Sequence, residues 1–433
     1  MRQLYLAATG MNRGKTTFAL GLLAALMERD LATGFIKPVG QRTAVVDGVP
    51  ADEDAILVRT VFGMPDPLAR MSPVHIPRGF TKAFINGTVP DDLSPRIEAA
   101  HRALAASHEV LLIEGTGHAG VGAVVGLSNA EVAARLGAPA LIISEGGVGR
   151  PIDEIVLNHA LFTLRGVRVV GAVINKVDAA VDPALPATLR RGLARHGIPL
   201  LGTLPFRPML SSPTLAMLTD QMRGELLSAG DDPDRVVEHV AIGAMQPRHV
   251  LERIGSGTLL IVPGDRGDVI HATVADAERR RAIRREIRRD PGLLERLRRR
   301  GPAGTDGADP RGELAGFLFT GGYRPRVQEL AVLRRAGIFA YLVGDDTYAA
   351  AARVHDLLVK THAGDHGKIA EIRRLVAENV DVDAILRCFA PWPPPTPAAG
   401  ALPVARSLLR AGAREVGRAA RVVRGGGRPT RRT

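Results

Sequence analysis

The stretch from Thr9 to Thr17 (TGMNRGKTT) holds the residue types and spacing best suited to chemistry on phosphates. It follows the apolar run Leu4–Ala8 and opens another, Phe18–Met27, which predicts a buried strand, a tight turn and a helix. The N–H groups and the dipole at a helix N-terminus attract anions, so we predict a phosphate-binding loop of a nucleotide site. Its candidate nucleotide-binding residues are Thr9, Gly10, Asn12, Arg13, Gly14, Lys15, Thr16 and Thr17.

Lys15 and Thr16 have the most specific predicted roles in this loop. In the pattern G-x-x-x-x-G-K-[ST], the lysine reaches the β- and γ-phosphates and the following hydroxyl binds Mg²⁺. Lys15 is therefore a candidate catalytic residue and Thr16 a candidate metal ligand. The loop departs from the pattern at its start, where Thr9 takes the place of the first glycine and Gly10 follows.

Two carboxylates stand where a metal at this loop would need them. Glu114 ends the apolar run Val110–Ile113, and Asp54 lies in the region after the second predicted strand, Thr33–Lys37. Mg²⁺ prefers oxygen ligands and keeps several water molecules. We therefore predict a Mg²⁺ ion held by Thr16, Asp54 and Glu114.

Lys37 and the acidic neighbours of Asp54 belong to the same region of the chain. The carboxyl end of a parallel strand faces the ligand crevice of an open α/β sheet, so Lys37 is a second candidate catalytic residue, which would bind substrate or a transferred group. The alternative is a strand-end lysine in solvent. For Asp52 and Glu53 we favour solvated loop charges.

A base-recognition segment is predicted at Asn175-Lys176-Val177-Asp178, directly after the buried run Val169–Asn175. Asn175 would contact the edge of a purine ring, Lys176 would cover its face, and Asp178 could pair with a guanine amino group. The nucleotide is accordingly predicted to be ATP, with GTP left open. The segment Glu145–Arg150 also follows a strand and would line the same crevice.

Strand-like and helix-like pieces alternate along the first half of the chain, which predicts an α/β fold with a mostly parallel sheet. A second, smaller α/β module begins near Asp232. We expect domains at residues 1–225 and 232–389, with an arginine-rich insertion at 278–311 and a proline-rich linker and basic tail at 390–433. The predicted strands are Leu4–Ala8, Thr33–Lys37, Val110–Glu114, Ala140–Ser144, Val169–Asn175, Leu200–Leu204, Val240–Ile242, Leu259–Val262, Leu314–Thr320 and Ala340–Val343.

Composition and charge narrow the class of protein. No run approaches the roughly 20 apolar residues of a membrane span, and one cysteine, Cys388, excludes an internal disulfide framework, so we expect a cytoplasmic protein without an integral membrane segment. The net charge of +12 depends on two segments: Val404–Thr433 has nine arginines and one glutamate, and Arg279–Arg300 has eleven arginines and three acids. The basic tail could bind nucleic acid or an anionic surface, but we favour a solubilising tail.

The order of these motifs resembles dethiobiotin synthetase and its relatives. The resemblance is carried by Thr9–Thr17, Lys37-Pro38-Val39, Asp54, Glu114-Gly115-Thr116-Gly117 and Asn175. It implies that Lys15, Thr16, Asp54 and Glu114 serve phosphate and Mg²⁺, that Asn175 contacts adenine, and that Lys37 lies near a carboxylated substrate. Met11-Asn12-Arg13 departs from the family pattern, which puts the substrate in question.

The second module resembles the DRTGG domain. Pro263–Ile270 (PGDRGDVI) and Thr320-Gly321-Gly322 carry this resemblance. Dethiobiotin synthetase-like and DRTGG domains are joined in the N-terminal region of the long phosphotransacetylases, and the resemblance covers about residues 1–390. Because only a linker and an arginine-rich tail follow, acetyl transfer is not expected. For Asp265-Arg266 we favour a structural turn with an ion pair over a regulatory ligand site.

Three functions are consistent with these residues. The first is a Mg²⁺-dependent P-loop ATPase whose DRTGG module senses a small ligand. The second is an ATP-dependent ligase or carboxylase, of dethiobiotin synthetase- or cobyrinate amidase-like type, that activates a carboxylate or carbamate near Lys37. The third is a non-catalytic protein that uses nucleotide to regulate partner binding. A nucleotide, a small metabolite and a second copy of the chain are the expected partners.

Overall fold

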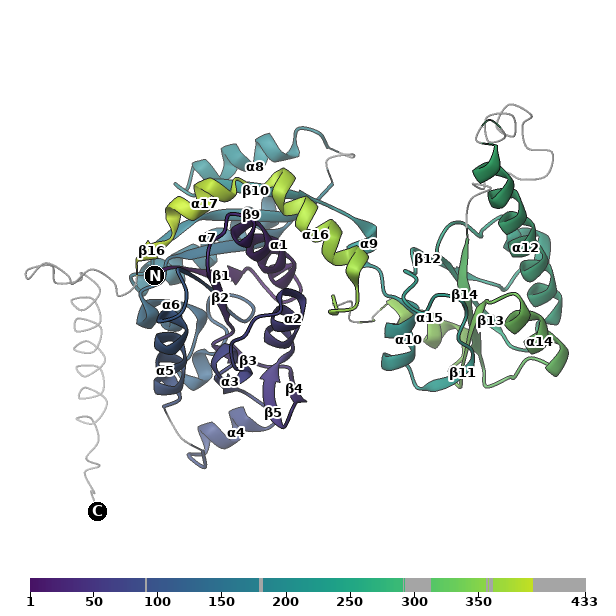
Figure 1. The fold of residues 1–433 in the computed structure, drawn as a ribbon, viewed down its shortest axis with the longest axis horizontal. Coiled ribbons are helices and arrows are strands. Elements are labelled where there is room, and N and C mark those ends of the chain that lie inside the picture. Colours follow the sequence, from purple (N-terminus) through teal and green to yellow (C-terminus); the bar gives the residue numbers. More distant parts are fainter. Residues whose placement is uncertain are drawn as a thin grey trace, which may run out of the picture. The chain divides into compact units, whose positions relative to one another are not determined.

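The computed structural model describes residues 1–89, 92–178, 182–290, 292, 313–355, 357 and 361–391. These residues form two compact units (Figure 1). The first contains residues 1–206 and the segment that begins at His362, and the second contains residues 207–361. Both units are α/β, which confirms the predicted fold class. In the described ranges, no helix is long and apolar enough to cross a membrane.

The first unit is built on a mostly parallel sheet in the order β10-β9-β8-β1-β7-β2, and β16 pairs antiparallel with β1. The parallel strands read as continuous Val, Ile and Leu runs because both faces of the sheet are buried. Each strand predicted for this half is present within two residues. The strands are β1 (Arg2–Ala8), β2 (Thr33–Ile36), β7 (Val110–Glu114), β8 (Ala140–Glu145), β9 (Val169–Val177), β10 (Leu200–Pro205) and β16 (Ala390–Pro391).

Helices connect and cover these strands. The core on one face of the sheet includes Tyr5, Ile113, Ile142 and Phe162. The helices of this unit are α1 (Lys15–Met27), α2 (Glu53–Phe62), α3 (Leu68–Met71), α4 (Phe80–Ile85), α5 (Ser94–Ala105), the 3₁₀ turn η1 (Ala123–Val125), α6 (Asn129–Leu136), α7 (Gly149–Leu164), α8 (Leu185–Ala194), α16 (His366–Asn379) and α17 (Val382–Cys388).

Helix α1 is buried on its outer side as well as on its sheet side. Its residues from Phe18 to Leu26 are all buried, so it needs a second layer of protein. Helix α16 supplies that layer: a Cβ on Gly21 would lie 2.3 Å from Cγ2 of Val376, which shows how closely the two helices approach. The chain then returns to the sheet, where the Asp381 amide donates to Leu201 O at 3.1 Å.

Two small β pairs lie between β2 and α4. Strands β3 (Val39–Gly40) and β6 (Val74–His75) are parallel, and β4 (Thr43–Val46) and β5 (Val49–Asp52) form an antiparallel hairpin. Asp47 and Gly48 make its two-residue turn with φ of 52° and 77°, as an Asp-Gly turn favours. This hairpin leads directly into α2 and thereby places Asp54 near the phosphate loop.

The second unit has a five-stranded sheet in the order β11-β15-β14-β13-β12, parallel except for β11. Its core contains Leu260, Phe317 and Phe319. The strands are β11 (Gly224–Ser228), β12 (His239–Ile242), β13 (Thr258–Pro263), β14 (Leu314–Thr320) and β15 (Phe339–Val343). The helices are α9 (Pro208–Ser211), α10 (Leu215–Gln221), α11 (Pro247–Leu251), α12 (Gly267–Arg289), α14 (Val327–Arg335) and α15 (Thr347–His355).

The two units divide differently from the predicted domains. Residues 207–225 and strand β11, which crosses the predicted boundary at 225, lie in the second unit. The segment from His362 to Phe389 lies in the first unit, because its helices cover α1. The predicted insertion begins inside α12, the helix that connects β13 with β14, so residues 278–289 are part of the regular fold. The remainder of that insertion, except Asp290 and Gly292, and the tail from residue 392 lie outside the described residues.

Candidate functional site

The predicted phosphate loop joins the carboxyl end of β1 to the N-terminus of α1. Asn12 and Gly14 have φ of 58° and 84°, so the loop turns through left-handed conformations just before the helix. No side chain caps α1 and its first turn contains no acidic residue. The N–H groups of this helix end are consequently available to an anion. Near the loop start, the hydroxyls of Thr9 and Ser144 are hydrogen-bonded at 3.0 Å.

Lys15 lies at the first position of α1. Burial, with the positive charge of Lys37 nearby, lowers its pKa from 10.5 to about 8, against the opposing effect of Glu114 and Asp54. The next residue, Thr16, donates its hydroxyl to Glu114 Oε1 at 3.0 Å. The structure therefore brings the two predicted loop residues beside the predicted carboxylates.

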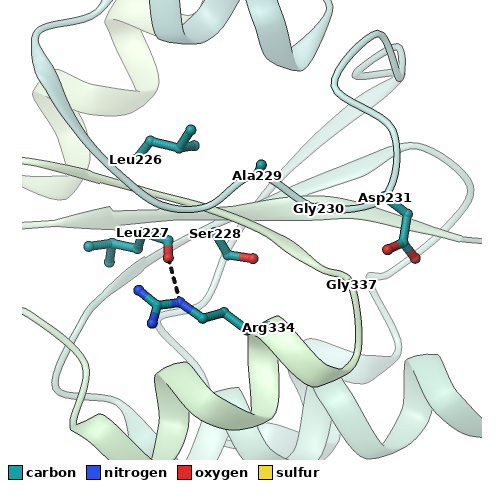
Figure 2. Close-up of a pocket in the computed structure, with 8 residues that line it drawn as sticks. All are labelled: Leu226, Leu227, Ser228, Ala229, Gly230, Asp231, Arg334 and Gly337. Carbon is teal, nitrogen blue, oxygen red and sulfur yellow. Dashed lines mark hydrogen bonds between the residues drawn. The ribbon is translucent and has the colours of Figure 1, made fainter.

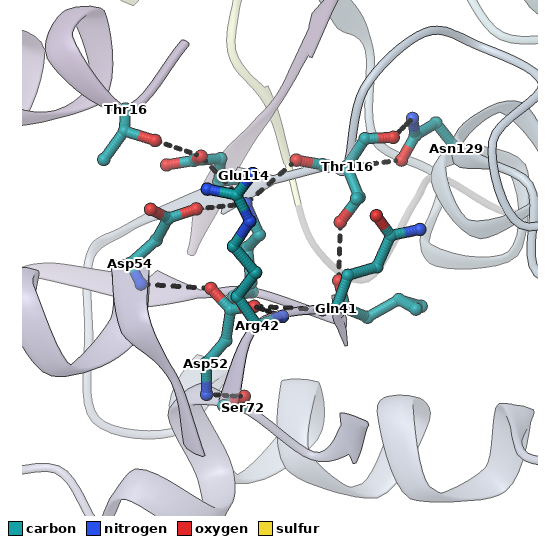
Figure 3. Close-up of polar contacts among 12 residues, drawn as sticks. Thr16, Gln41, Arg42, Asp52, Asp54, Ser72, Glu114, Thr116 and Asn129 are labelled. Carbon is teal, nitrogen blue, oxygen red and sulfur yellow. Dashed lines mark hydrogen bonds and ion pairs between the residues drawn. The ribbon is translucent and has the colours of Figure 1, made fainter. Parts of the chain in front are cut away.

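Lys37 lies between these carboxylates rather than in solvent. Strands β2 and β7 are neighbours with Ile36 opposite Ile113, so Lys37 and Glu114 follow at adjacent positions of the sheet edge. The Lys37 Nζ donates to Asp54 Oδ2 at 2.6 Å, to Glu114 Oε1 at 3.0 Å and to Gly115 O at 3.2 Å. Lys37 is 3% exposed and Glu114 is fully buried. Figure 3 shows Thr16 and Asp54 on either side of Glu114.

Burial and opposite charge compete in this group. Burial disfavours the charged form of Lys37, but Asp54, Glu114 and Asp52 together hold its pKa above the ordinary value. Burial also raises the pKa of Glu114, which Lys37 and Lys15 oppose. The geometry, with the ammonium within hydrogen-bond distance of two carboxylates, favours an ionised cluster.

Asp52 is not the solvated loop charge that we favoured from the sequence. It is buried and precedes α2, where its carboxylate accepts from the Asp54 amide at 3.0 Å and the Gln41 amide at 3.1 Å. Its own amide donates to Ser72 Oγ at 3.0 Å. Aspartate is a preferred helix N-cap, and this preference was the available sequence signal. Asp52 thus fixes the first turn of α2, which carries Asp54 (Figure 3).

Asn129 holds the loop after Glu114, a role that the sequence did not indicate. Its side chain accepts from the Thr116 amide at 2.9 Å and donates to Thr116 O at 2.7 Å and His118 O at 2.6 Å. The hydroxyl of Tyr5 donates to Asn129 Oδ1 at 2.8 Å. This network orients the Gly115 carbonyl toward Lys37, and the contacts of Thr116 and Asn129 are visible in Figure 3.

The predicted Mg²⁺ ligands fit a hard divalent cation. Thr16, Asp54 and Glu114 present one hydroxyl and two carboxylates, the oxygen donors that Mg²⁺ prefers. Glu114 Oε2 is buried and has no hydrogen-bond partner among the described residues, which is costly for a carboxylate oxygen unless a cation or water contacts it. Among the described residues, no group of three His, Cys, Asp or Glu side chains could hold a metal.

The base-recognition segment lies beside the phosphate loop. Asn175 Nδ2 donates to Arg13 O at 3.2 Å. Lys176 Nζ donates to Glu145 Oε1 at 2.7 Å, and the Arg13 guanidinium pairs with the other oxygen of the same carboxylate. Asp178 follows β9 as an exposed residue. The pairing of Arg13 with Glu145 was not predicted from the sequence.

The glycine-rich turn of the second unit is occupied by its own side chains. Arg266 pairs with Asp268 at 2.9 Å and donates to Gly243 O at 3.2 Å and Met245 O at 3.0 Å. These bonds are those of the structural turn that we favoured. Gly267 faces Glu329, whose Oε1 lies 2.2 Å from the place of a Cβ.

A surface cavity of about 330 Å³ lies elsewhere in the second unit. Its charged lining residues are Asp231 and Arg334, and Arg334 Nε donates to Leu227 O at 3.0 Å (Figure 2). The cavity is lined by Leu226, Leu227, Ser228, Ala229, Gly230, Asp231, Arg334 and Gly337.

Comparison with known proteins supports the two-unit description. Residues 2–214 match the AAA domain family and residues 217–357 match the DRTGG domain family. The chain is 26% identical over 406 residues to a phosphate acetyltransferase of Pseudomonas putida, an alignment that covers 90% of this chain and 52% of that protein. The phosphate acetyltransferase of Pseudomonas aeruginosa is 27% identical over 289 residues, which cover 63% of this chain and 40% of the relative. The chain therefore spans about half the length of the curated relatives it matches or less.

Among solved structures, one match is the CBS and DRTGG regulatory region of Clostridium perfringens pyrophosphatase, which was crystallised with its activator diadenosine tetraphosphate. It is 15% identical, with a TM-score of 0.25, and the match covers 39% of this chain and 62% of that one.

The first unit thus defines the class: an α/β P-loop domain whose phosphate loop faces a buried lysine and two carboxylates. More particularly, the chain joins a dethiobiotin synthetase-like P-loop domain to a DRTGG domain, and about 90% of it is homologous to the N-terminal region of phosphate acetyltransferases. This confirms the resemblance drawn from the motifs.

Proposed function

We propose that this protein binds and hydrolyses ATP with Mg²⁺ and that its DRTGG domain senses a small ligand. One observation carries the proposal. The uncapped N-terminus of α1 and Lys15 lie beside Thr16, Asp54 and Glu114, so phosphate-binding and Mg²⁺-binding groups converge at one edge of the sheet. The match to the AAA domain family supports a nucleotide as the ligand.

The proposed chemistry is positioning and charge stabilisation of a transferred phosphoryl group. Backbone N–H groups at the start of α1 would bind phosphate oxygens, and Lys15 would neutralise charge that develops on the β- and γ-phosphates. Thr16, Asp54 and Glu114 would hold a Mg²⁺ ion, which supplies further neutralisation when bound. Burial lowers the pKa of Lys15 to about 8. A bound phosphate is an anion, so it would favour the charged form of Lys15.

A ligase or carboxylase is the second candidate function, and the position of Lys37 favours it. The Lys37 ammonium is buried at the sheet edge, within reach of the Gly115 carbonyl and beside the proposed metal ligands. A carboxylate or carbamate substrate at this edge would pair with the Lys37 ammonium once a bound Mg²⁺ neutralises Asp54 and Glu114. ATP hydrolysis that appears only when such a substrate is present would support this function.

A non-catalytic, nucleotide-regulated role is the third candidate. Asp54 and Glu114 are both engaged by Lys37, so neither is placed as a free general base in the described site. Tight nucleotide binding without turnover would support this role. We do not propose the acetyl transfer for which the relatives are named, because our proposal rests on groups suited to phosphate and Mg²⁺.

The ligand of the second unit is proposed to be a small metabolite or nucleotide. A cavity of about 330 Å³ is at the lower end of the range for small-molecule sites. Arg334 and Asp231 would give it polar contacts. We further propose a homo-oligomer in the cytoplasm; size-exclusion chromatography with light scattering tests the first of these features, and cell fractionation tests the second.

The decisive experiment measures Mg²⁺-dependent binding and hydrolysis of ATP and GTP, with and without a panel of amines, carboxylates and carbamates. Lys15→Ala should weaken ATP binding by about 10- to 100-fold, because it removes charge-assisted bonds to phosphate. Lys82→Ala, on exposed α4, is the matched control and should bind as the native protein does. If neither nucleotide binds with Mg²⁺, the proposed function is wrong.

A further inference from the structure

Glu145 connects the phosphate loop to the base-recognition segment. It ends β8, between the loop after β1 and the segment that ends β9 in the sheet order. One carboxylate oxygen accepts from Lys176 Nζ at 2.7 Å, and the other pairs with Arg13 of the loop. The two segments are also connected directly, because Asn175 Nδ2 donates to the backbone carbonyl of Arg13 at 3.2 Å.

These three segments are packed too closely to rearrange without cost. A Cβ on Gly14 would lie 1.9 Å from Asn175 Nδ2, and a Cβ on Gly146 would lie 2.5 Å from Lys176 O. Lys176 itself has φ of 56°, a left-handed conformation that side chains other than glycine adopt at a cost. The pair with Glu145 is an interaction that can offset this cost.

The charge of Glu145 is retained in this setting. Burial opposes its ionised form, but the hydrogen bond and charge of Lys176, together with Arg13, hold the pKa of Glu145 below its ordinary value. Its side chain is 26% exposed, and that of Arg13 is 17% exposed. A partly buried carboxylate with two cationic partners is a charge-assisted junction stronger than a surface ion pair.

We propose that Glu145 is a positioning residue that fixes Asn175 and Lys176 against the phosphate loop, so that the base and the phosphates of a nucleotide are bound by one preorganised unit. This inference rests on the proposed nucleotide binding and adds a residue that selects for the nucleoside part. Glu145 acts through Lys176 and Arg13 and need not touch the phosphates. Losing it should impair recognition of a nucleotide and spare recognition of a bare polyphosphate, because Asn175 and Lys176 serve the base whereas Lys15 and the N–H groups of α1 serve the phosphates.

The test compares the affinity of the full chain for Mg-ATP with that for Mg-tripolyphosphate, both by calorimetry. Glu145→Gln should weaken ATP binding by about tenfold, the effect of losing one charge-assisted contact, and leave tripolyphosphate binding unchanged. Lys176→Met, which removes the other end of the contact, should give the same selective loss. Thermal melting of each variant reports whether it is folded.

Glu154→Gln is the matched control, because Glu154 also contacts Arg13, at 3.5 Å, whereas within the described residues Lys176 pairs with Glu145 instead. It should change the ratio of the two affinities by about twofold at most, as expected for a weaker ion pair. An equal loss of both ligands in Glu145→Gln, or no loss of either, would overturn the positioning role. If the native chain binds tripolyphosphate and ATP equally weakly, the nucleotide function itself fails.

Discussion

The two units present the same kind of element, a glycine-containing turn from a parallel strand into a helix, in opposite states. At α1 of the first unit, no side chain caps the helix and its first turn has no acidic residue. At α12 of the second unit, Asp268 lies in the first turn and Arg266 is bound by Asp268 and two backbone carbonyls. The N-terminus of α1 is therefore arranged to receive an anion, whereas the N-terminus of α12 already has the carboxylate of Asp268.

This difference separates a ligand site from a structural turn where the sequence motifs alone do not. Both turns contain glycine and a basic residue, but the two basic residues differ in their hydrogen-bond partners. Arg266 donates its hydrogen bonds to groups of its own unit. Burial lowers the pKa of Lys15, so a bound anion would stabilise its charged form. The useful distinction is whether the polar groups of a turn are already satisfied.

The largest expected effect is on the buried cluster of the first unit. Lys37→Met leaves the carboxylates of Glu114 and Asp54 without their cation, so the free energy of unfolding should fall by about 3–5 kcal/mol in denaturant titrations without ligand. Added Mg²⁺ should recover more stability in this variant than in the native protein, because a divalent cation can replace the ammonium. Lys82→Met is the control. Native-like stability of Lys37→Met would mean that the cluster is not ionised.

The next largest loss of stability is expected from replacing a glycine of the phosphate loop. Gly14→Ala combines a left-handed φ of 84° with a clash against Asn175 and should cost about 2–3 kcal/mol of stability and weaken ATP binding. Gly48→Ala has a similar φ of 77° but open space around it, so it isolates the conformational cost of about 1 kcal/mol. Equal losses in the two variants would show that the contact between Gly14 and Asn175 is unimportant.

Removing Arg266 tests the other side of the comparison. Arg266→Ala should lower the stability of the second unit by about 2 kcal/mol, because two backbone carbonyls lose a charged donor. ATP affinity should not change. Chemical denaturation, monitored by hydrogen exchange of β13, measures the stability of the second unit. Calorimetry measures the ATP affinity. A loss of ligand response with unchanged stability would instead assign Arg266 to a binding site.

The smallest effect is expected from pH. The pKa of Lys15 is 10.5 in the unfolded chain and about 8 in the folded protein, so between these values the unfolded state binds more protons and stability rises with pH. Phosphate binding favours charged Lys15, so ATP affinity should fall above pH 8, by up to about tenfold per pH unit. Calorimetry in buffers of different ionisation enthalpy should show proton uptake at pH 8.5 that disappears in Lys15→Met. Proton uptake that persists in this variant would point to another group.

Much of this site could be predicted from the sequence because its parts follow buried strands. Val110–Glu114 is an uninterrupted apolar run with one acid at its end, and such a run has few alternatives to a buried parallel strand. The loop from Thr9 to Thr17 could likewise be placed between a strand and a helix. The local sequence determines neither the order of the strands nor their register. The contact of Lys37 with Glu114 could therefore be found only in the structure.

The compact units divide the chain differently from the predicted domains for a related reason. Residues 362–389 have ordinary amphipathic patterns that do not indicate which unit they cover. The relevant signal was in α1, whose apolar residues from Phe18 to Leu26 extend around the whole helix and therefore require a second covering layer. Asp52 illustrates the same limit at short range, because its role depends on a hairpin, β4–β5, that brings Gln41 to its carboxylate.

The return of the chain to cover α1 has a consequence for biosynthesis. Ribosomes release the N-terminal part of a protein first, and domains generally fold in that order. Here the nascent P-loop sheet emerges long before Val376 can pack on Gly21, so α1 presents apolar surface to water while the whole second unit is translated. We therefore expect a product terminated at Phe206 to contain the phosphate loop but to aggregate through the uncovered side of α1.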